Sequence, residues 1–245
     1  MRFDVPLLGQ KAVHVWSCDL ATPMATDEVQ DAARILCDFE RERLARLVFE
    51  RDRVRYRRAH LWLRHVLGAY LGVDAAAVPL QQGGQRKPEI AGSSDLSFNL
   101  AHSADVALLA VSRLPHVGVD VEVPGEHRNL ESTARGVYTA AEQQELSQVE
   151  ASQFERAFLT LWTRKEAVLK SMGVGLMLNP TRLHVGLKNG DHAGAIRVAV
   201  PPGDYGDTID VADLSAGGDW ISAIAVPQGW DSLAVFPADA NRKSS

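Results

Sequence analysis

The run Val117-Gly-Val-Asp-Val-Glu-Val123 constrains the fold more than any other part of the chain, because valine alternates with Gly118, Asp120 and Glu122. Such a strict two-residue period predicts a β-strand, in which successive side chains point to opposite faces. The valines would anchor one face in a core. The two carboxylates would share the other face, about 7 Å apart along the strand. We expect Gly118 to leave open space beside these acids for a ligand. The solvated face of an amphipathic strand would give the same alternation.

A second pattern, between Phe154 and Lys170, predicts one amphipathic helix. Its apolar residues recur at helical spacing. They are Phe154, Ala157, Phe158, Leu161 and Val168. The segment Leu161-Trp-Thr-Arg-Lys-Glu-Ala-Val-Leu-Lys170 places Glu166 and Lys170 one turn apart on one face.

Glu166 is a candidate third carboxylate beside Asp120 and Glu122. Three such acids would form an oxygen-rich site for Mg²⁺, the ion that commonly neutralises phosphate oxygens in proteins. Lys170 would balance the phosphate charge that the ion does not reach. The alternative is an ordinary Glu-to-Lys pair one helical turn apart, which only stabilises the helix.

The two motifs together resemble the signature of the Sfp-type 4′-phosphopantetheinyl transferases. Further short segments fall in the order of that family, and the resemblance covers roughly residues 40 to 180. These segments are Lys87-Pro88, Phe98-Asn-Leu-Ala-His102, Tyr138-Thr-Ala-Ala-Glu142 and Gly173-Val-Gly-Leu176.

The resemblance implies a mixed α/β (α+β) fold with two similarly folded, pseudo-symmetric halves, residues 1–114 and 115–245. Each half would pack helices on a small, mostly antiparallel sheet, and the active site would lie at their interface. The first half would hold the adenine and 3′-phosphate of coenzyme A. The second half would carry the magnesium ligands and the catalytic residues.

The implied activity is transfer of the 4′-phosphopantetheine group of coenzyme A to a serine of an acyl or peptidyl carrier protein. This is the reaction of a holo-[acyl-carrier-protein] synthase, and it releases adenosine 3′,5′-bisphosphate. Asp120, Glu122 and Glu166 would hold Mg²⁺. Glu166 would accept the serine proton, and Lys170 would act beside it. Both Lys165 and Lys170 would contact the phosphates of the donor.

The resemblance also assigns residues to coenzyme A. His102 is similar to a histidine that contacts the 3′-phosphate, and Lys87-Pro88 to a segment beside the adenine. The chain departs from the family pattern at Ala101, where a serine is usual, and at His60, where our alignment places an arginine. We therefore expect Arg43, Arg46 or another nearby arginine to bind the 3′-phosphate, because guanidinium groups suit phosphate. Without the resemblance, His102 reads as a loop residue that caps the next strand.

Charge is segregated along the chain, whose net charge is −5. Residues 41–64 hold nine arginines against Glu42, Glu50 and Asp52, which gives +6 there and −11 elsewhere. Such a block is typical of proteins that bind nucleic acid, acidic proteins or polyphosphates, and also of solvated helices. The acidic remainder argues against nucleic acid. A non-catalytic module that binds coenzyme A or carrier proteins stays open.

Composition bounds the remaining expectations. No apolar stretch is long enough to cross a bilayer, and the first residues lack the apolar core of a secretory signal, so we expect a cytoplasmic protein without membrane contact. Cys18 and Cys37 are too few for a disulfide framework or a cysteine zinc cluster. Two halves in one chain favour a monomer. Carrier proteins would dock on the helices within residues 131–148.

Periodicity and turn residues predict the other elements. The expected helices cover residues 27–37, 40–71, 130–137, 140–148 and 152–172. The expected strands cover residues 14–20, 97–100, 106–111, 117–123, 182–187, 195–200, 220–226 and 232–236. Residues 126–130 are expected to form a loop, and residues 241–245 to fray.

Overall fold

The protein is a mixed α/β fold in a computed structural model that describes residues 2–83, 87–92, 95–125, 129–173, 178–188, 195–215, 218–227, 229–237 and 242–243. The helices are α1 Thr26–Ile35, α2 Asp38–Arg46, α3 Glu50–Leu71, α4 Leu130–Val137, α5 Ala140–Ser147 and α6 Phe154–Met172. Short 3₁₀ turns cover Ala75–Ala77, Ala151–Gln153 and Pro180–Arg182. The first strands are β1 Arg2–Phe3, β2 Ala12–Asp19, β3 Leu80–Gln82, β4 Pro88–Ile90, β5 Ser97–Ser103, β6 Val106–Ser112 and β7 Gly118–Glu122. The later strands are β8 Ala195–Gly203, β9 Gly206–Asp213, β10 Ile221–Pro227, β11 Ser232–Phe236 and β12 Arg242–Lys243.

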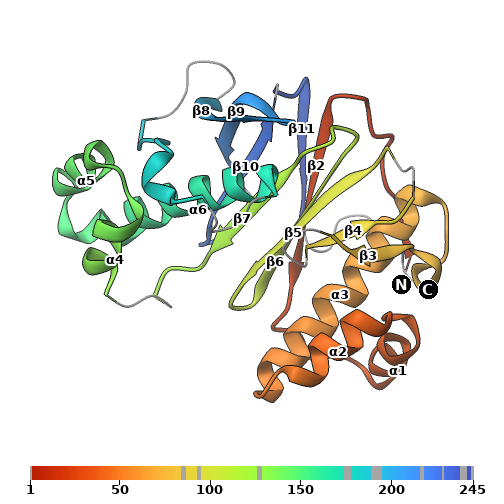
Figure 1. Ribbon diagram of the computed structural model, residues 1–245. Helices are drawn as coiled ribbons and strands as arrows, with labels where there is room; N and C mark the ends of the chain where they lie inside the picture. Colours follow the sequence, from red (N-terminus) through yellow and green to blue (C-terminus); the bar gives the residue numbers. More distant parts are fainter. Residues whose placement is uncertain are drawn as a thin grey trace.

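Two four-stranded sheets form the body of the molecule, with strand orders β11-β2-β6-β5 and β7-β10-β9-β8 (Figure 1). Both contain the same unit: a strand, a long helix, and a hairpin whose second strand pairs antiparallel with the first strand. The unit is β2-α3-β5-β6 in one half and β7-α6-β9-β10 in the other. This confirms the predicted pair of similarly folded halves with mostly antiparallel sheets.

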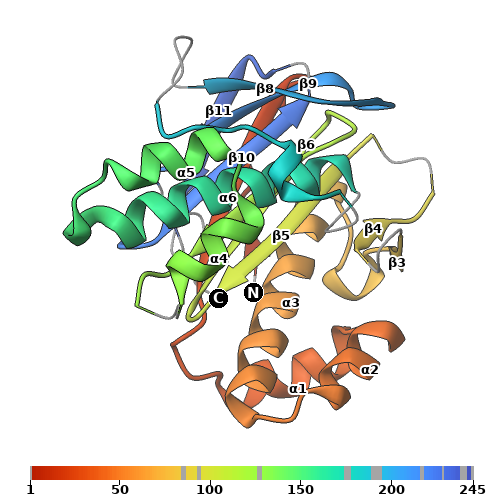
Figure 2. The same cartoon turned by 60° about the vertical axis from the view of Figure 1, so that its left-hand side comes forward.

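The fourth strand of each sheet distinguishes the halves. β8 extends the second sheet beside β9, whereas β11 pairs in parallel with β2 and completes the first sheet. The two-stranded pairing of β1 with β12 brings the chain ends together, as both views show (Figures 1 and 2). The last part of the chain therefore returns to the sheet of the first half.

Three apolar clusters arrange these elements in layers. One cluster lies between α3 and the first sheet, and another lies between α6 and the second sheet. A third cluster joins residues of β2, β6, β7 and β10, so it fills the space between the two sheets. α3 and α6 accordingly flank the paired sheets on opposite sides (Figures 1 and 2).

β7 has the alternation that its sequence predicts. Val119 and Val121 are buried in the cluster between the sheets. The opposite face, which carries Gly118 and Asp120, lies against α6. The expectation that Gly118 leaves open space for a ligand is wrong, because a Cβ built there would lie 2.0 Å from the carbonyl oxygen of Ala167. Gly118 instead permits close packing of the helix backbone on the strand.

The predicted helix over residues 40–71 is two helices. α2 ends at Arg46, and α3 begins at Glu50 after a short extended link. Glu50 and Asp52 lie in the first turn of α3, where negative charge stabilises the positive end of the helix dipole. Residues on both sides of the link are helical, so the helical pattern alone did not show the break. The predicted end at residue 71 is confirmed, because Gly72 follows it in the left-handed conformation with φ of 68°.

Two further predictions about strands need correction. Residues 183–187 are not a strand, because their backbone groups bond to side chains: Val185 N–H donates to Glu142, and Leu187 N–H to Glu145. β9 was missed, since its aspartates disguise the alternation of Ile209 and Val211. The expected features at residues 126–128, 174–177, 241 and 244–245 lie outside the described residues. None of the helices in the described part of the chain is long and apolar enough to cross a bilayer.

The Gly118→Ala substitution should destabilise the protein by about 3 kcal/mol or more, because a methyl group would overlap the α6 backbone rather than a movable side chain. Urea unfolding measures this change. Gly136→Ala in α4 is the matched control: nothing lies within 4 Å of the added Cβ, and alanine favours a helix by about 1 kcal/mol. Unfolding of Gly118→Ala at the wild-type urea concentration would contradict the close packing.

Candidate active site

The acids of β7 lie against polar residues of α6. Trp162 Nε1 donates to Glu122 Oε1 at 3.1 Å, and Lys170 Nζ donates to Asp120 Oδ1 at 2.5 Å. Asp120 and Glu122 are about 6.6 Å apart along the strand, whereas Trp162 and Lys170 are two helical turns, about 12 Å, apart along the helix axis. The long side chains of Trp162 and Lys170 span this difference.

Asp120 is the most buried of the three predicted metal ligands, with 5% of its surface exposed. Its Oδ2 is buried and has no hydrogen-bond partner among the described residues. Burial raises the pKa of Asp120 to about 7, and the charges of Glu122 and Glu166 add to this against the opposing effect of Lys170. The single positive charge of Lys170 therefore does not offset the burial of the Asp120 carboxylate.

Glu166 and Glu122 complete the acidic group. Burial and the charge of Glu122 raise the pKa of Glu166, which makes no hydrogen bond to any described residue. Glu122 is held at both oxygens, by Trp162 and by Ser103 Oγ at 2.9 Å. The three carboxylates thus belong to one electrostatic group at the β7–α6 junction.

The chemistry of these acids suits a hard divalent cation, although their side chains are not yet close enough to coordinate one together. Within the described ranges, no three His, Cys, Asp or Glu side chains are grouped closely enough to hold a metal ion together. The group nevertheless offers only carboxylate oxygens, which Mg²⁺ prefers, and the orphaned Oδ2 of Asp120 is an acceptor for such an ion. The metal-ligand role of Asp120, Glu122 and Glu166 stays a prediction.

A cavity of about 320 Å³, here called the interface cavity, adjoins this acidic group. Residues of both halves line it, because β5 and the end of α6 meet there. They include His60, Lys87, Pro88, Asn99, His102 and Lys170. Lys170 belongs to both features, since it lines the cavity and also bonds to Asp120.

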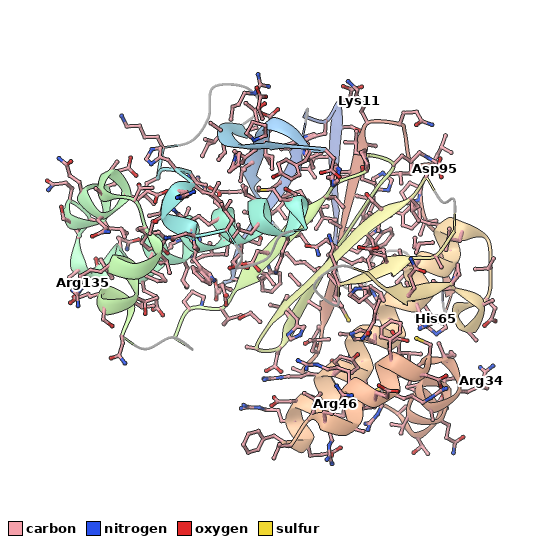
Figure 3. All side chains as sticks on the ribbon, viewed as in Figure 1. Lys11, Arg34, Arg46, His65, Asp95 and Arg135 are labelled. Carbon is pink, nitrogen blue, oxygen red and sulfur yellow. The ribbon has the colours of Figure 1, made fainter. Side chains whose placement is uncertain are left out.

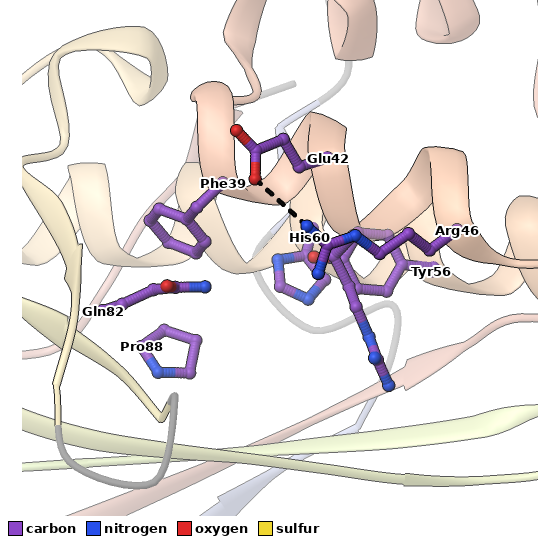
Figure 4. A pocket seen from close by; sticks show the side chains of 8 residues that line it. Phe39, Glu42, Arg46, Tyr56, His60, Gln82 and Pro88 are labelled. Carbon is purple, nitrogen blue, oxygen red and sulfur yellow. Dashed lines mark ion pairs between the residues drawn. The ribbon is translucent and has the colours of Figure 1, made fainter.

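A second pocket of about 450 Å³, here called the arginine pocket, shares His60 and Pro88 with the interface cavity (Figure 4). α2, α3 and the β3-β4 hairpin build it. Its lining includes Arg43, Arg46, Tyr56, His60, Gln82 and Pro88. The structure thus brings six residues predicted for coenzyme A, Arg43, Arg46, Lys87, Pro88, His102 and Lys170, to two adjoining hollows.

The interface cavity gathers positive groups whose pKa values are lowered. Burial and the neighbouring charge of Lys170 lower the pKa of Lys87 to about 8, against the opposing effect of Glu89. Lys87 Nζ donates to the carbonyl oxygen of Lys170 at 3.2 Å, which ties the β3-β4 hairpin to α6. Burial of its imidazole ring also lowers the pKa of His102, and the positive charges of His60, Lys170 and Arg55 lower it further. An anion bound there would relieve this repulsion.

A buried ion network, which the sequence did not reveal, supports the shared wall of the two hollows. Glu40 accepts from His60 Nδ1 at 2.8 Å, from Arg64 Nε at 2.7 Å and from the backbone N–H of Cys37 at 2.9 Å. Tyr56 stacks on the imidazole ring of His60, and the two ring centroids are 3.9 Å apart. Glu40 thereby fixes the orientation of His60 toward the pockets.

The prediction that Lys165 contacts phosphate is wrong. Lys165 is fully buried, and its Nζ lies 2.7 Å from Glu142 and donates to the carbonyl oxygens of Pro180 and Leu183. Arg164 beside it is also structural, because it binds both oxygens of Asp213. Adjacent residues on a helix point in different directions, so Trp162 and Lys170 of this motif bond to the acids of β7 whereas Lys165 points to Glu142.

Lys165→Met should destabilise the fold by about 3–5 kcal/mol, because it leaves Glu142 buried without its cation while the methylene stem is kept. Urea unfolding is the measurement. The control is Arg34→Met, which removes an exposed pair with Asp31 and should change stability by about 0.5 kcal/mol or less. Equal stability of Lys165→Met and the wild type would restore a ligand-binding role for Lys165.

Glu40→Gln should be about 3–5 kcal/mol less stable than the wild type at pH 7, since Arg64 loses its buried counter-charge. The folded state lowers the pKa of Glu40 from 4.5 to about 2, although burial alone would raise it, because His60 and Arg64 favour the carboxylate. The contribution of Glu40 is therefore complete above pH 4.5 and is lost as the pH falls toward 2. The difference in unfolding free energy should narrow by about 2 kcal/mol at pH 3. A difference that is the same at pH 3 and pH 7 would contradict this.

Comparison with known proteins agrees with this geometry. The profile ACPS, described as the 4′-phosphopantetheinyl transferase superfamily, matches residues 116–220, and AASDHPPT_N, described as 4′-phosphopantetheinyl transferase, N-terminal, matches residues 22–114. The 4′-phosphopantetheinyl transferase HetI of Nostoc sp. is 34% identical over 167 residues, which are 67% of this chain and 70% of HetI. The 4′-phosphopantetheinyl transferase AcpT of Salmonella typhimurium is 38% identical over 91 residues, 37% of this chain and 47% of AcpT. The L-aminoadipate-semialdehyde dehydrogenase-phosphopantetheinyl transferase of Xenopus laevis is 28% identical over 163 residues, 62% of this chain and 54% of that protein. The chain therefore belongs to the 4′-phosphopantetheinyl transferase superfamily.

Proposed function

We propose that this enzyme transfers the 4′-phosphopantetheine group of coenzyme A to a serine of an acyl or peptidyl carrier protein, as Sfp-type members and holo-[acyl-carrier-protein] synthases do. Adenosine 3′,5′-bisphosphate is the second product. The observation that carries the proposal is the position of Lys170, which lines a cationic cavity and bonds to an acid of the β7–α6 junction. A diphosphate bound between them would meet both kinds of charge.

Phosphoryl transfer depends mainly on positioning and on neutralising negative charge. Mg²⁺ held by Asp120, Glu122 and Glu166 would supply the neutralisation that these acids cannot give. Lys170 would exchange its bond to Asp120 for one to a phosphate oxygen, since a cation on the acids replaces the charge that it now provides. Lys170 is therefore a candidate catalytic residue.

The remaining donor would occupy the two adjoining hollows. We assign Arg43, Arg46 and His102 to the 3′-phosphate and Lys87 and Pro88 to the side of the adenine, and the lining of the two hollows by these residues supports this assignment. Arginine suits this role, because its guanidinium group can donate two parallel hydrogen bonds to phosphate. Arg43 and Arg46 would then supply the charge that Ala101 and His60 do not.

Glu166 is our candidate for the group that accepts the serine proton. Its pKa is raised by burial and by Glu122, which makes a carboxylate a stronger base. It also makes no hydrogen bond to the described residues, so its oxygens are available to a substrate. Lys170, one helical turn away, would stabilise the charge that develops on the phosphoryl group.

Carrier proteins would dock beside the cavity, on residues 131–148 of α4 and α5. Figure 3 shows where α4 lies, because Arg135 of this helix is labelled there, as is Arg46 of α2 in the other half. Both halves of the cavity come from one chain, which supports a monomer, and we retain the expectation of a cytoplasmic location.

A nucleic-acid-binding function finds less support. Arg55 pairs with Asp105, Arg58 binds the carbonyl oxygens of Asp19 and Thr22, and Arg64 pairs with Glu40. These three of the nine arginines are therefore committed to internal contacts rather than offered to a nucleic acid.

Asp120→Ala and Glu166→Gln should each slow transfer by about a hundredfold or more, because each removes part of the charge arrangement at the phosphoryl group. The measurement is the mass shift of apo carrier proteins incubated with coenzyme A and Mg²⁺. Glu150→Gln, an exposed carboxylate outside the site, is the matched control and should react like the wild type.

Urea unfolding of each variant separates loss of chemistry from loss of structure. Near-normal modification by either variant would contradict the proposed mechanism. Binding of coenzyme A by the wild type without any mass shift on a panel of carriers would instead favour the non-catalytic module.

A further inference from the structure

Glu122 is held from both halves of the molecule. Ser103 Oγ, at the end of β5, donates to Glu122 Oε2 at 2.9 Å. Trp162 Nε1, on α6, donates to the other oxygen at 3.1 Å. Both donors are neutral, so they orient the carboxylate without cancelling its charge. Glu122 is consequently positioned before any cation is bound.

The second contact of Ser103 determines which way its proton points. The backbone N–H of Val123 donates to Ser103 Oγ at 3.3 Å. A backbone amide can only donate, and a serine hydroxyl carries one proton, so that proton is left for Glu122. The arrangement therefore makes Glu122 the acceptor of the Ser103 hydroxyl, which fixes the orientation of its carboxylate.

The hydrogen bond from Val123 N–H to Ser103 also joins the two sheets. β5 and β7 belong to different sheets, but Val119 N–H donates to Asn99 Oδ1 at 2.8 Å and Val123 N–H to Ser103. Asn99 and Ser103 lie four residues apart on β5, and Val119 of β7 and Val123, directly after β7, have the same separation. The two side chains thus take the place of backbone partners along this seam.

We propose that Ser103 is a positioning residue for the divalent cation site: its hydroxyl fixes the Glu122 carboxylate and couples that orientation to the contact between β5 and β7. The identity of the cation as Mg²⁺ rests on the proposed function. Asp120 has an orphaned oxygen and Glu166 has no hydrogen bond to the described residues, so Glu122 is the acid with the most fixed orientation.

The test compares Ser103→Val with Ser103→Thr, two substitutions of the same shape that differ by one hydroxyl group. Mn²⁺ binding to the protein alone, without coenzyme A or carrier, is measured from the electron paramagnetic resonance signal of free Mn²⁺. Ser103→Val should weaken Mn²⁺ binding about ten- to a hundredfold, whereas Ser103→Thr should stay within about threefold of the wild type. Equal affinities of the two variants would overturn the proposal.

Ser97→Ala on the same strand controls for general loosening. Ser97 Oγ donates to the carbonyl oxygens of Ser112 and Leu114, away from the acids. Its loss should lower stability and leave Mn²⁺ affinity unchanged. A comparable loss of Mn²⁺ affinity in Ser97→Ala would show that strand stability, rather than the Ser103 hydroxyl, governs the site, and would also overturn the proposal.

Transfer assays separate this proposal from the proposed function. Ser103→Val should raise the Mg²⁺ concentration needed for half-maximal transfer while the KM for coenzyme A stays unchanged. If the wild type transfers but the Val and Thr variants do not differ, the role of Ser103 fails alone. If the wild type binds Mn²⁺ with the expected differences but modifies no carrier, the proposed function fails and the positioning role stands. A wild type that binds no Mn²⁺ overturns both.

Discussion

The direct packing of the α6 backbone on β7 at Gly118 is the constraint on which the candidate site depends. A strand and a helix usually keep their backbones apart by the width of their side chains, but here there is no room even for a methyl group between Gly118 and Ala167. This closeness lets short acidic side chains of β7 reach the residues of α6. The pairs of Glu122 with Trp162 and of Asp120 with Lys170 follow from it.

The same closeness creates an electrostatic problem that a ligand can solve. Burial and neighbouring carboxylates raise the pKa values of Asp120 and Glu166, while burial and neighbouring cations lower the pKa values of Lys87 and His102 in the adjoining cavity. Lys170 already bridges the two groups by bonding to Asp120. A divalent cation on the acids together with a diphosphate in the cavity would relieve both repulsions, which is the charge distribution of the proposed reaction.

Periodicity predicted the elements that carry the site, because β7 and α6 have one polar and one apolar face. The strand over residues 117–123 and the helix that includes Glu166 and Lys170 were found in this way. Sequence could not separate Lys165 from Lys170, since both are cations beside an acid. Only the fold shows that Lys165 points to Glu142.

The missed features share one physical cause: they depend on partners that are distant in sequence. The role of Gly118 depends on α6, and the orientation of His60 depends on Glu40 twenty residues away. Residues 183–187 resemble a strand, but side chains of α5 satisfy their backbone groups. Family resemblance supplied Lys87, Pro88 and His102, which no local pattern would have chosen, and these residues do line one cavity.

The proposed reaction requires that the acids of β7 and α6 together hold a divalent cation at the edge of the interface cavity. Anomalous diffraction from crystals grown with Mn²⁺ and coenzyme A tests it most directly. We predict one strong manganese peak in contact with Asp120, Glu122 and Glu166, with Lys170 turned from Asp120 toward the diphosphate. Bound coenzyme A with Lys170 still on Asp120 and no manganese at these carboxylates would contradict it.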